Sequence, residues 1–305
     1  MVHVPGGTFQ MGCDDFFPEE RPAHPVDVGA FAIDIHPVTV AQFRRFVKAT
    51  GYVTIAERPL DPGDFPGAAP ADLVPGALVF QRTRGPVPLD DWRRWWQYCP
   101  GADWLHPFGP AGNLDGRDRH PVTQIAHPDA LAYADWMGKQ LPSEAEWEFA
   151  ARGGLEAATY SWGDEFEPKR RRMANTWVGE FPWQFQRGRG QAGHPDTTPV
   201  GSYPPNGYGL FDMTGNIWEW TTDPYAPGHH APAPADCCAP RRSRRTPTTA
   251  DPAATQPASL VIKGGSYLCA PNYCLRYRPA ARQRQTEDTA TCHLGFRCVL
   301  RGDPS

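Results

Sequence analysis

The chain has 305 residues, 40% of them hydrophobic, so it is long enough to bury a core of its own. Its formal net charge of −4 argues against a protein that binds nucleic acid by neutralising phosphates. The 30 Gly and 35 Pro residues exclude long helices and a regular sheet, and predict a loop-rich α+β fold with little regular secondary structure.

The first residues predict a strand. Residues 1–12, MVHVPGGTFQMG, contain a Gly-Gly turn and lack the basic start and apolar run of a signal peptide. No stretch approaches the roughly 18 apolar residues that a membrane helix needs. We therefore expect a soluble, cytoplasmic protein with no membrane partner.

A strand and a helix are expected next. Residues 31–40, FAIDIHPVTV, alternate like a strand before the chain turns at Pro37. Thr39 and Gln42 then form a capping box for a helix, which Gly51 ends.

Two further helices are expected in the middle of the chain. One begins near Pro128 and ends at Gly138. The other lies in LPSEAEWEFAARGG, residues 141–154, where Ser143 and Glu146 supply a second capping box.

The remaining segments are less regular. Residues 60–120 have no period and must be held by their own packing, with four tryptophans as the expected anchors: Trp92, Trp95, Trp96 and Trp104. Residues 225–258, rich in Pro, Ala, Thr and Arg, form the least ordered loop. Strand character returns in LVIKGGSYLC, LRYRPAAR and HLGFRCVLR. No internal repeat is evident, and the length fits one large domain or two small ones.

The most informative stretch is GGSYLCAPNYC, residues 264–274. Pro271 and Asn272 favour a β-turn, which would bring Cys269 and Cys274 within bonding reach. The pair could form a disulfide, remain as two buried thiols, or bind a soft metal. With two thiolates, Cu(I) fits better than zinc, which usually takes four ligands.

Two other clusters could bind metals. In NGYGLFDMTGNIWEW, residues 206–220, Asp212 and Glu219 are hard oxygen donors around a bend at Gly215, which indicates either an irregular Ca²⁺ site or an ordinary turn beside a solvated Glu. A zinc site is the third candidate, although its spacing matches no standard finger; its residues would be His229, His230, Cys237 and Cys238.

Together these motifs resemble a known family. VPGGTFQMG, HPVTVAQFRRFVKATGY, LPSEAEWEFAARGG, SYPPNGYGLFDMTGNIWEW, KGGSYLCAPNYCLRYRPAAR and HLGFRC occur in the order found in the formylglycine-generating enzymes, or sulfatase-modifying factors. The resemblance covers nearly the whole chain and implies a single domain over residues 1–305. It implies a loop-rich fold related to the C-type lectin architecture.

The resemblance also implies an activity. Cys269 and Cys274 match the cysteine pair that binds Cu(I) in active members, and Ser266 and Tyr273 match positions that line the oxygen and substrate pocket. The implied reaction is the oxidation of a cysteine in a Cys-X-Pro-X-Arg motif of a sulfatase to Cα-formylglycine. Its oxidant is O₂, and a thiol or another reductant supplies electrons.

Calcium sites are implied as well. Asp212, Gly215, Ile217 and Glu219 match one family site, with Gly215 and Ile217 contributing carbonyl oxygens. A second site would begin with Asn175 and the carbonyl of Thr176. There the chain departs from the family, because QFQRGRGQAG, residues 184–193, replaces the acidic turn that completes the coordination.

Other departures concern the active site and disulfides. Ala270 stands where some relatives have histidine, and His293 stands where many have asparagine. Pro279 and Ala134 replace structural cysteines of secreted members, which leaves Cys298 without its family partner. This pattern fits a reducing, bacterial-type cytoplasm.

We therefore predict a monomeric copper-dependent oxidoreductase. The main alternative is a catalytically silent peptide- or glycan-binding module on the same fold, although silent relatives usually lack the cysteine pair. Two weaker alternatives are a zinc-stabilised structural protein and a sulfoxide synthase of ergothioneine synthesis, which would need an iron-binding helical bundle ahead of this domain.

Overall fold

The computed structural model describes residues 1–64, 67–186, 196–229 and 257–302. Its strands are short: β1 Val2–Val4, β2 Gly7–Met11, β3 His24–Val28, β4 Phe31–Ile33, β5 Gly76–Phe80, β6 Trp96–Pro100, β7 Trp218–Pro224, β8 Ser259–Lys263, β9 Arg282–Thr286, β10 Leu294–Gly295 and β11 Val299–Arg301. The α-helices are α1 Val40–Thr50, α2 His127–Trp136 and α3 Glu144–Arg152. Six 3₁₀ turns complete the elements: η1 Pro18–Glu20, η2 Ile55–Glu57, η3 Pro62–Asp64, η4 Pro70–Asp72, η5 Trp92–Arg94 and η6 Pro168–Arg170.

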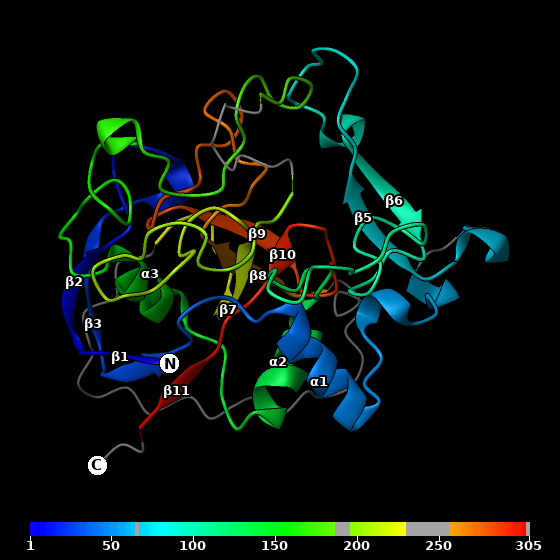
Figure 1. The fold of residues 1–305 in the computed structure, drawn as a ribbon, viewed down its shortest axis with the longest axis horizontal. Helices are drawn as coiled ribbons and strands as arrows, with labels where there is room; N and C mark the ends of the chain where they lie inside the picture. Colours follow the sequence, from blue (N-terminus) through cyan, green and yellow to red (C-terminus); the bar gives the residue numbers. More distant parts are fainter. Residues whose placement is uncertain (65–66, 187–195, 230–256, 303–305) are drawn as a thin grey trace, which may run out of the picture.

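A four-stranded sheet lies at the centre of the molecule (Figure 1), in the order β10-β7-β8-β9. Only the β10–β7 pair is parallel within it. A second sheet, β1-β4-β11, joins the two ends of the chain, and β2-β3 and β5-β6 form separate antiparallel pairs. These short strands and long connections confirm the loop-rich α+β fold.

The predicted helix signals are confirmed. At the start of α1, the side chain of Thr39 accepts a hydrogen bond from the backbone N–H of Gln42, whose own side chain accepts from the backbone of Thr39. The helix ends at Gly51, whose φ of 68° is readily adopted only by glycine. Ser143 and Glu146 cap α3 in the same reciprocal way.

Helix α3 packs against β7 and β8 and thereby supports the central sheet. Trp147 is fully buried in this contact, while Phe149 packs edge-on against Phe9, with ring centroids 5.3 Å apart. The two side chains therefore leave the helix in different directions, as their spacing requires.

Two expectations need correction. Of the four tryptophans in residues 60–120, Trp95 and Trp104 are buried anchors, but Trp92 is 45% exposed and lies at the surface. The segment LRYRPAAR is not a strand until its last residue, Arg282. Its conformation is instead fixed by ion pairs such as that of Arg278 with Glu20 at 2.8 Å, which sequence periodicity cannot reveal.

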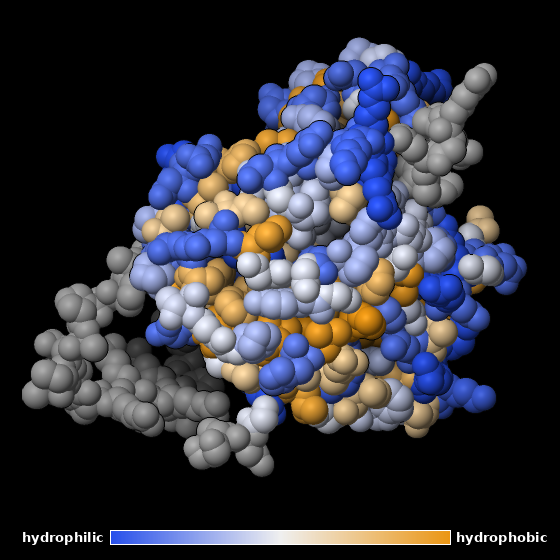
Figure 2. Space-filling view, turned by 60° about the vertical axis from the view of Figure 1, so that its left-hand side comes forward, coloured by the Kyte–Doolittle hydropathy of each residue, from blue (hydrophilic) through white to orange (hydrophobic). Residues whose placement is uncertain are grey.

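The predicted loop, residues 225–258, lies largely outside the described residues, as do His230, Cys237 and Cys238 of the proposed zinc cluster. His229 is described, and its ring lies 4.9 Å from that of His24. Within the described ranges, no helix is long and apolar enough to cross a membrane. The face in Figure 2 is a mosaic of hydrophilic and hydrophobic residues.

Candidate active site

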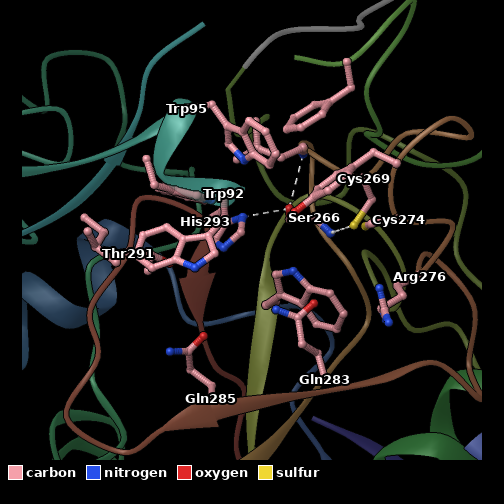
Figure 3. A pocket seen from close by; sticks show the side chains of 16 residues that line it. Trp92, Trp95, Ser266, Cys269, Cys274, Arg276, Gln283, Gln285, Thr291 and His293 are labelled. Atoms are coloured by element: carbon pink, nitrogen blue, oxygen red, sulfur yellow. Dashed lines mark hydrogen bonds between the residues drawn. The ribbon is translucent and has the colours of Figure 1, made fainter. Parts of the chain in front are cut away.

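A pocket of about 330 Å³ opens beside the central sheet, and both Cys269 and Cys274 line it. Figure 3 shows the two cysteines beside Ser266, with Trp95 and Trp92 on one side and side chains from β9 below. The pocket therefore combines segments that are far apart in the sequence.

The cysteine pair is held by the predicted turn. Both Tyr273 and Cys274 donate a backbone hydrogen bond to the carbonyl of Ala270, at 3.1 and 3.0 Å. The side chain of Asn272 fixes the outer side of the turn, because it accepts from the N–H of Phe181 and donates to its carbonyl. The turn and the proximity of the two cysteines are thus confirmed.

Both cysteines are free thiols, 1% and 6% exposed, so the disulfide alternative does not describe this structure. Burial raises the pKa of Cys269 well above its ordinary value, and its hydrogen bond to Cys274 raises it further. Burial also opposes ionisation of Cys274, but the hydrogen bond from Cys269 and the nearby backbone and charge of Arg276 hold the pKa of Cys274 below the ordinary value. Of the two thiols, Cys274 is therefore the one that ionises more readily.

Ser266 forms hydrogen bonds with both Cys269 of the cysteine pair and His293. Its backbone N–H donates to the sulfur of Cys269 at 3.4 Å, and its hydroxyl accepts from the N–H of Leu268. The same hydroxyl lies 3.0 Å from Nδ1 of His293, and burial lowers the pKa of that imidazole to about 3. His293 is therefore neutral at physiological pH and occupies the pocket wall as a hydrogen-bonding group.

Tyr273 belongs to an aromatic wall. Its ring stacks on Phe181, with centroids 4.5 Å apart, and meets Trp95 edge-on at 5.3 Å. Tyr273 is 36% exposed and lines the pocket. This packing fixes the ring beside the cysteine pair.

The segment after Cys274 is anchored to η1. Arg276 pairs with Glu19 at 2.5 Å and lies over the ring of Phe17 at 4.1 Å. The carboxylate of the next residue, Glu20, binds Arg278 through two hydrogen bonds. Because these groups are largely buried, the pairs fix the position of the cysteine turn relative to the N-terminal part of the chain.

Glu219, expected as a calcium ligand, has protein partners in this structure. Both of its carboxylate oxygens bind the guanidinium of Arg297, at 2.7 and 2.8 Å, and one also accepts from Nε1 of Trp147. Arg297 in addition donates to the backbone carbonyl of Asp212. Arg297 therefore balances the charge of Glu219, and the calcium site expected at Asp212, Gly215, Ile217 and Glu219 stays a prediction.

Asp212 and Gly215, two other members of the expected calcium site, pair with backbone N–H groups. The carboxylate of Asp212 accepts from the N–H of Gly201, and the carbonyl of Gly215 accepts from the N–H of Ile217. Within the described ranges, no group of three or more His, Cys, Asp or Glu side chains could hold a metal ion.

The second predicted calcium site differs in one respect. Asn175 is fully buried, and its Oδ1 has no hydrogen-bond partner in the described part of the chain. The carbonyl of Thr176 accepts from Arg172 at 3.1 Å. Residues 187–195, which include most of the departing segment, lie outside the described residues.

Comparison with solved structures defines the class of fold. The structure of PvdO from Pseudomonas aeruginosa aligns with a TM-score of 0.64 over 99% of this chain and 94% of that chain, at 24% identity. CarF aligns with a TM-score of 0.52 over 99% and 98% of the two chains, at 20% identity. These similarities establish a shared fold.

The family follows from the sequence comparisons. Residues 1–302 match the sulfatase-modifying factor enzyme 1-like domain, and the chain belongs to this family. It is 57% identical to the formylglycine-generating enzyme of Mycobacterium tuberculosis over 98% of this chain and 97% of that protein. It is also 37% identical to inactive Cα-formylglycine-generating enzyme 2 of Mus musculus, over 98% and 85%. The resemblance seen in the sequence motifs is thus confirmed, and the activity must be argued from the site.

The sequence did not reveal the rest of the pocket. Gln283 and Gln285 on β9 and Thr291 before β10 line it, and none belongs to a recognisable motif. The alternation of strand β9 was the only available signal, because it places residues 283 and 285 on the same face.

Proposed function

We propose that this protein oxidises a cysteine in a Cys-X-Pro-X-Arg motif of a sulfatase to Cα-formylglycine, with O₂ as the oxidant and a thiol or similar reductant. The observation that carries the proposal is the pair of buried, unbridged thiols of Cys269 and Cys274 in the wall of an open pocket. Identity of 57% to a formylglycine-generating enzyme supports it.

The residues fit a Cu(I) ion. The two hydrogen-bonded thiol groups are adjacent soft donors, which is the ligand type that Cu(I) prefers. Bound copper would supply the one-electron and O₂ chemistry that amino-acid side chains lack. Because the described part of the chain brings two sulfurs to this pocket, a coordination position remains for the sulfur of the substrate.

The surrounding residues then have distinct tasks. The N–H of Ser266 orients the sulfur of Cys269, and its hydroxyl, hydrogen-bonded to His293, faces the space where the substrate cysteine would lie. The aromatic wall around Tyr273 limits access of water to the thiols. Arg276 places a positive charge beside Cys274 and favours its thiolate.

The calcium site at Asp212, Gly215, Ile217 and Glu219 stays a prediction from the family resemblance. A calcium ion is proposed also at Asn175, where Oδ1 is buried without a partner in the described residues. Oxygen ligands of this kind suit Ca²⁺, with the carbonyl of Thr176 as a second donor. The ion would stabilise the fold from outside the pocket and take no part in the oxidation.

Co-expression with a sulfatase tests the proposed function in cells. A host without formylglycine-generating activity should produce an active sulfatase when this protein is present. Sulfatase activity should be absent without it, and also when the target cysteine is changed to alanine. An inactive sulfatase despite soluble expression of both proteins would favour the silent binding module.

A further inference from the structure

Strand β9 forms the wall of the pocket that lies opposite Trp95 (Figure 3). Gln283 and Gln285 both line the pocket, whereas Arg282 and Arg284 point to the other face, where they bind Glu144 and the hydroxyl of Ser259. Figure 3 shows both glutamine side chains extending from β9 toward the space below Ser266 and Cys274.

Neither glutamine amide has a hydrogen bond to any described residue, although both side chains are half-buried. Each amide offers one acceptor and two N–H donors, which is enough to pair with both the N–H and the C=O of a peptide group. If a ligand covered these two amides without forming hydrogen bonds to them, their desolvation would cost free energy. We therefore expect the ligand of this pocket to be polar where it meets them.

Other polar atoms of the pocket are also unpaired. Thr291 is 4% exposed and Trp95 is fully buried, yet Oγ1 of Thr291 and Nε1 of Trp95 have no hydrogen-bond partner in the described residues. Nε of Arg276, which also lines the pocket, lacks a partner as well. Unpaired buried polar atoms are rare in folded proteins, and here three of them surround one cavity.

The spacing of the two glutamines matches an extended peptide. Residues i and i+2 of a strand lie about 6.7 Å apart, and the backbone of any extended chain repeats with the same period. Two amides on β9 can therefore each meet a peptide group of the substrate, two residues apart. Such contacts are made to the backbone and do not depend on the side chains of the substrate.

We propose that Gln283 and Gln285 are substrate-binding residues that bind the backbone of an extended polypeptide next to the target cysteine. This inference rests on the proposed function. It explains how one pocket could accept sulfatases whose sequences differ around the motif, while rejecting a segment that is already folded into a helix. Thr291, Trp95 and Arg276 would complete the set of polar contacts.

Binding measurements test this inference without turnover. A fluorescent peptide that carries the motif with serine in place of the target cysteine is titrated with the wild-type protein and with Gln283→Leu, Gln285→Leu and the double variant. Each single change should weaken binding about fivefold, the cost of one hydrogen bond, and the double change about 25-fold. Gln10→Leu is the matched control, because Gln10 is an exposed strand glutamine that does not line this pocket. It should bind like the wild type.

Ester substitution identifies the backbone contact itself. Replacing one peptide bond of the ligand by an ester removes an N–H and weakens the neighbouring acceptor. The wild type should lose affinity at positions two residues apart, and the double variant should lose nothing further at those positions. The inference is wrong if the double variant binds within twofold of the wild type, or if every ester costs the same in both proteins.

The two hypotheses can fail separately. A wild-type protein that binds the peptide with this pattern but never converts its cysteine-containing form would refute the proposed oxidation and leave the backbone contact intact. Conversion by the wild type with unchanged binding by the leucine variants would refute only the role of the glutamines. Unchanged melting temperatures of the variants exclude unfolding as a cause.

Discussion

Replacing either cysteine of the pair is expected to reduce conversion of the sulfatase peptide to below about a thousandth of the wild-type rate, because Cys269→Ser and Cys274→Ser each remove half of the soft donor set. Folding should be nearly unaffected, since serine has a similar size and neither cysteine is in a disulfide. Turnover by mass spectrometry and melting temperature by calorimetry measure the two effects separately.

Cys13→Ser provides the matched control, because Cys13 is also a free cysteine and lies outside the pocket. It should keep wild-type turnover. Retention of most of the activity by either Cys269→Ser or Cys274→Ser would contradict the copper assignment. Equal losses in all three variants would instead indicate a general sensitivity of the protein to thiol removal.

Glu219→Ala is expected to produce the largest loss of stability, about 3–5 kcal/mol in the free energy of unfolding. The variant leaves the guanidinium of Arg297 buried without its partner, and Nε1 of Trp147 without its acceptor. Urea unfolding measures the loss. It should be equally large in the presence of calcium and of a chelator, because the arginine supplies the opposite charge.

An exposed ion pair serves as the control. Asp118 pairs with Arg44 at 2.6 Å, but their side chains are 66% and 44% exposed, so Asp118→Ala should cost at most about 1 kcal/mol. A small effect of Glu219→Ala would contradict the structural role of the buried pair. A loss of stability that appears only when calcium is present would instead identify Glu219 as a calcium ligand.

Features encoded by neighbouring residues could be predicted from the sequence. The caps of α1 and α3 depend on residues three positions apart, and the turn at Ala270 depends on Pro271 and Asn272. The same local encoding gave the cysteine pair, because a tight turn brings its two ends together. The family motifs then supplied a function for that pair.

Features that join distant segments could not be predicted in this way. Glu219 and Arg297 are 78 positions apart, and a carboxylate next to a bend looks the same in sequence whether it binds calcium or arginine. The alternation of β9 places Gln283 and Gln285 on one face but does not indicate their importance, which comes from the unpaired polar atoms around them. Predicting the ion pair or the role of the glutamines requires knowing how distant segments of the chain pack together.

The most direct test of the central claim is mass spectrometry of a Cys-X-Pro-X-Arg peptide incubated with the reduced protein, a thiol, Cu(I) and air. Parallel samples omit the metal or the oxygen. The account predicts that the cysteine loses its sulfur and gains a carbonyl, which an aldehyde-reactive amine traps, only when both copper and oxygen are present. Conversion at full rate without copper, or an unchanged peptide with copper bound to the protein, would contradict it.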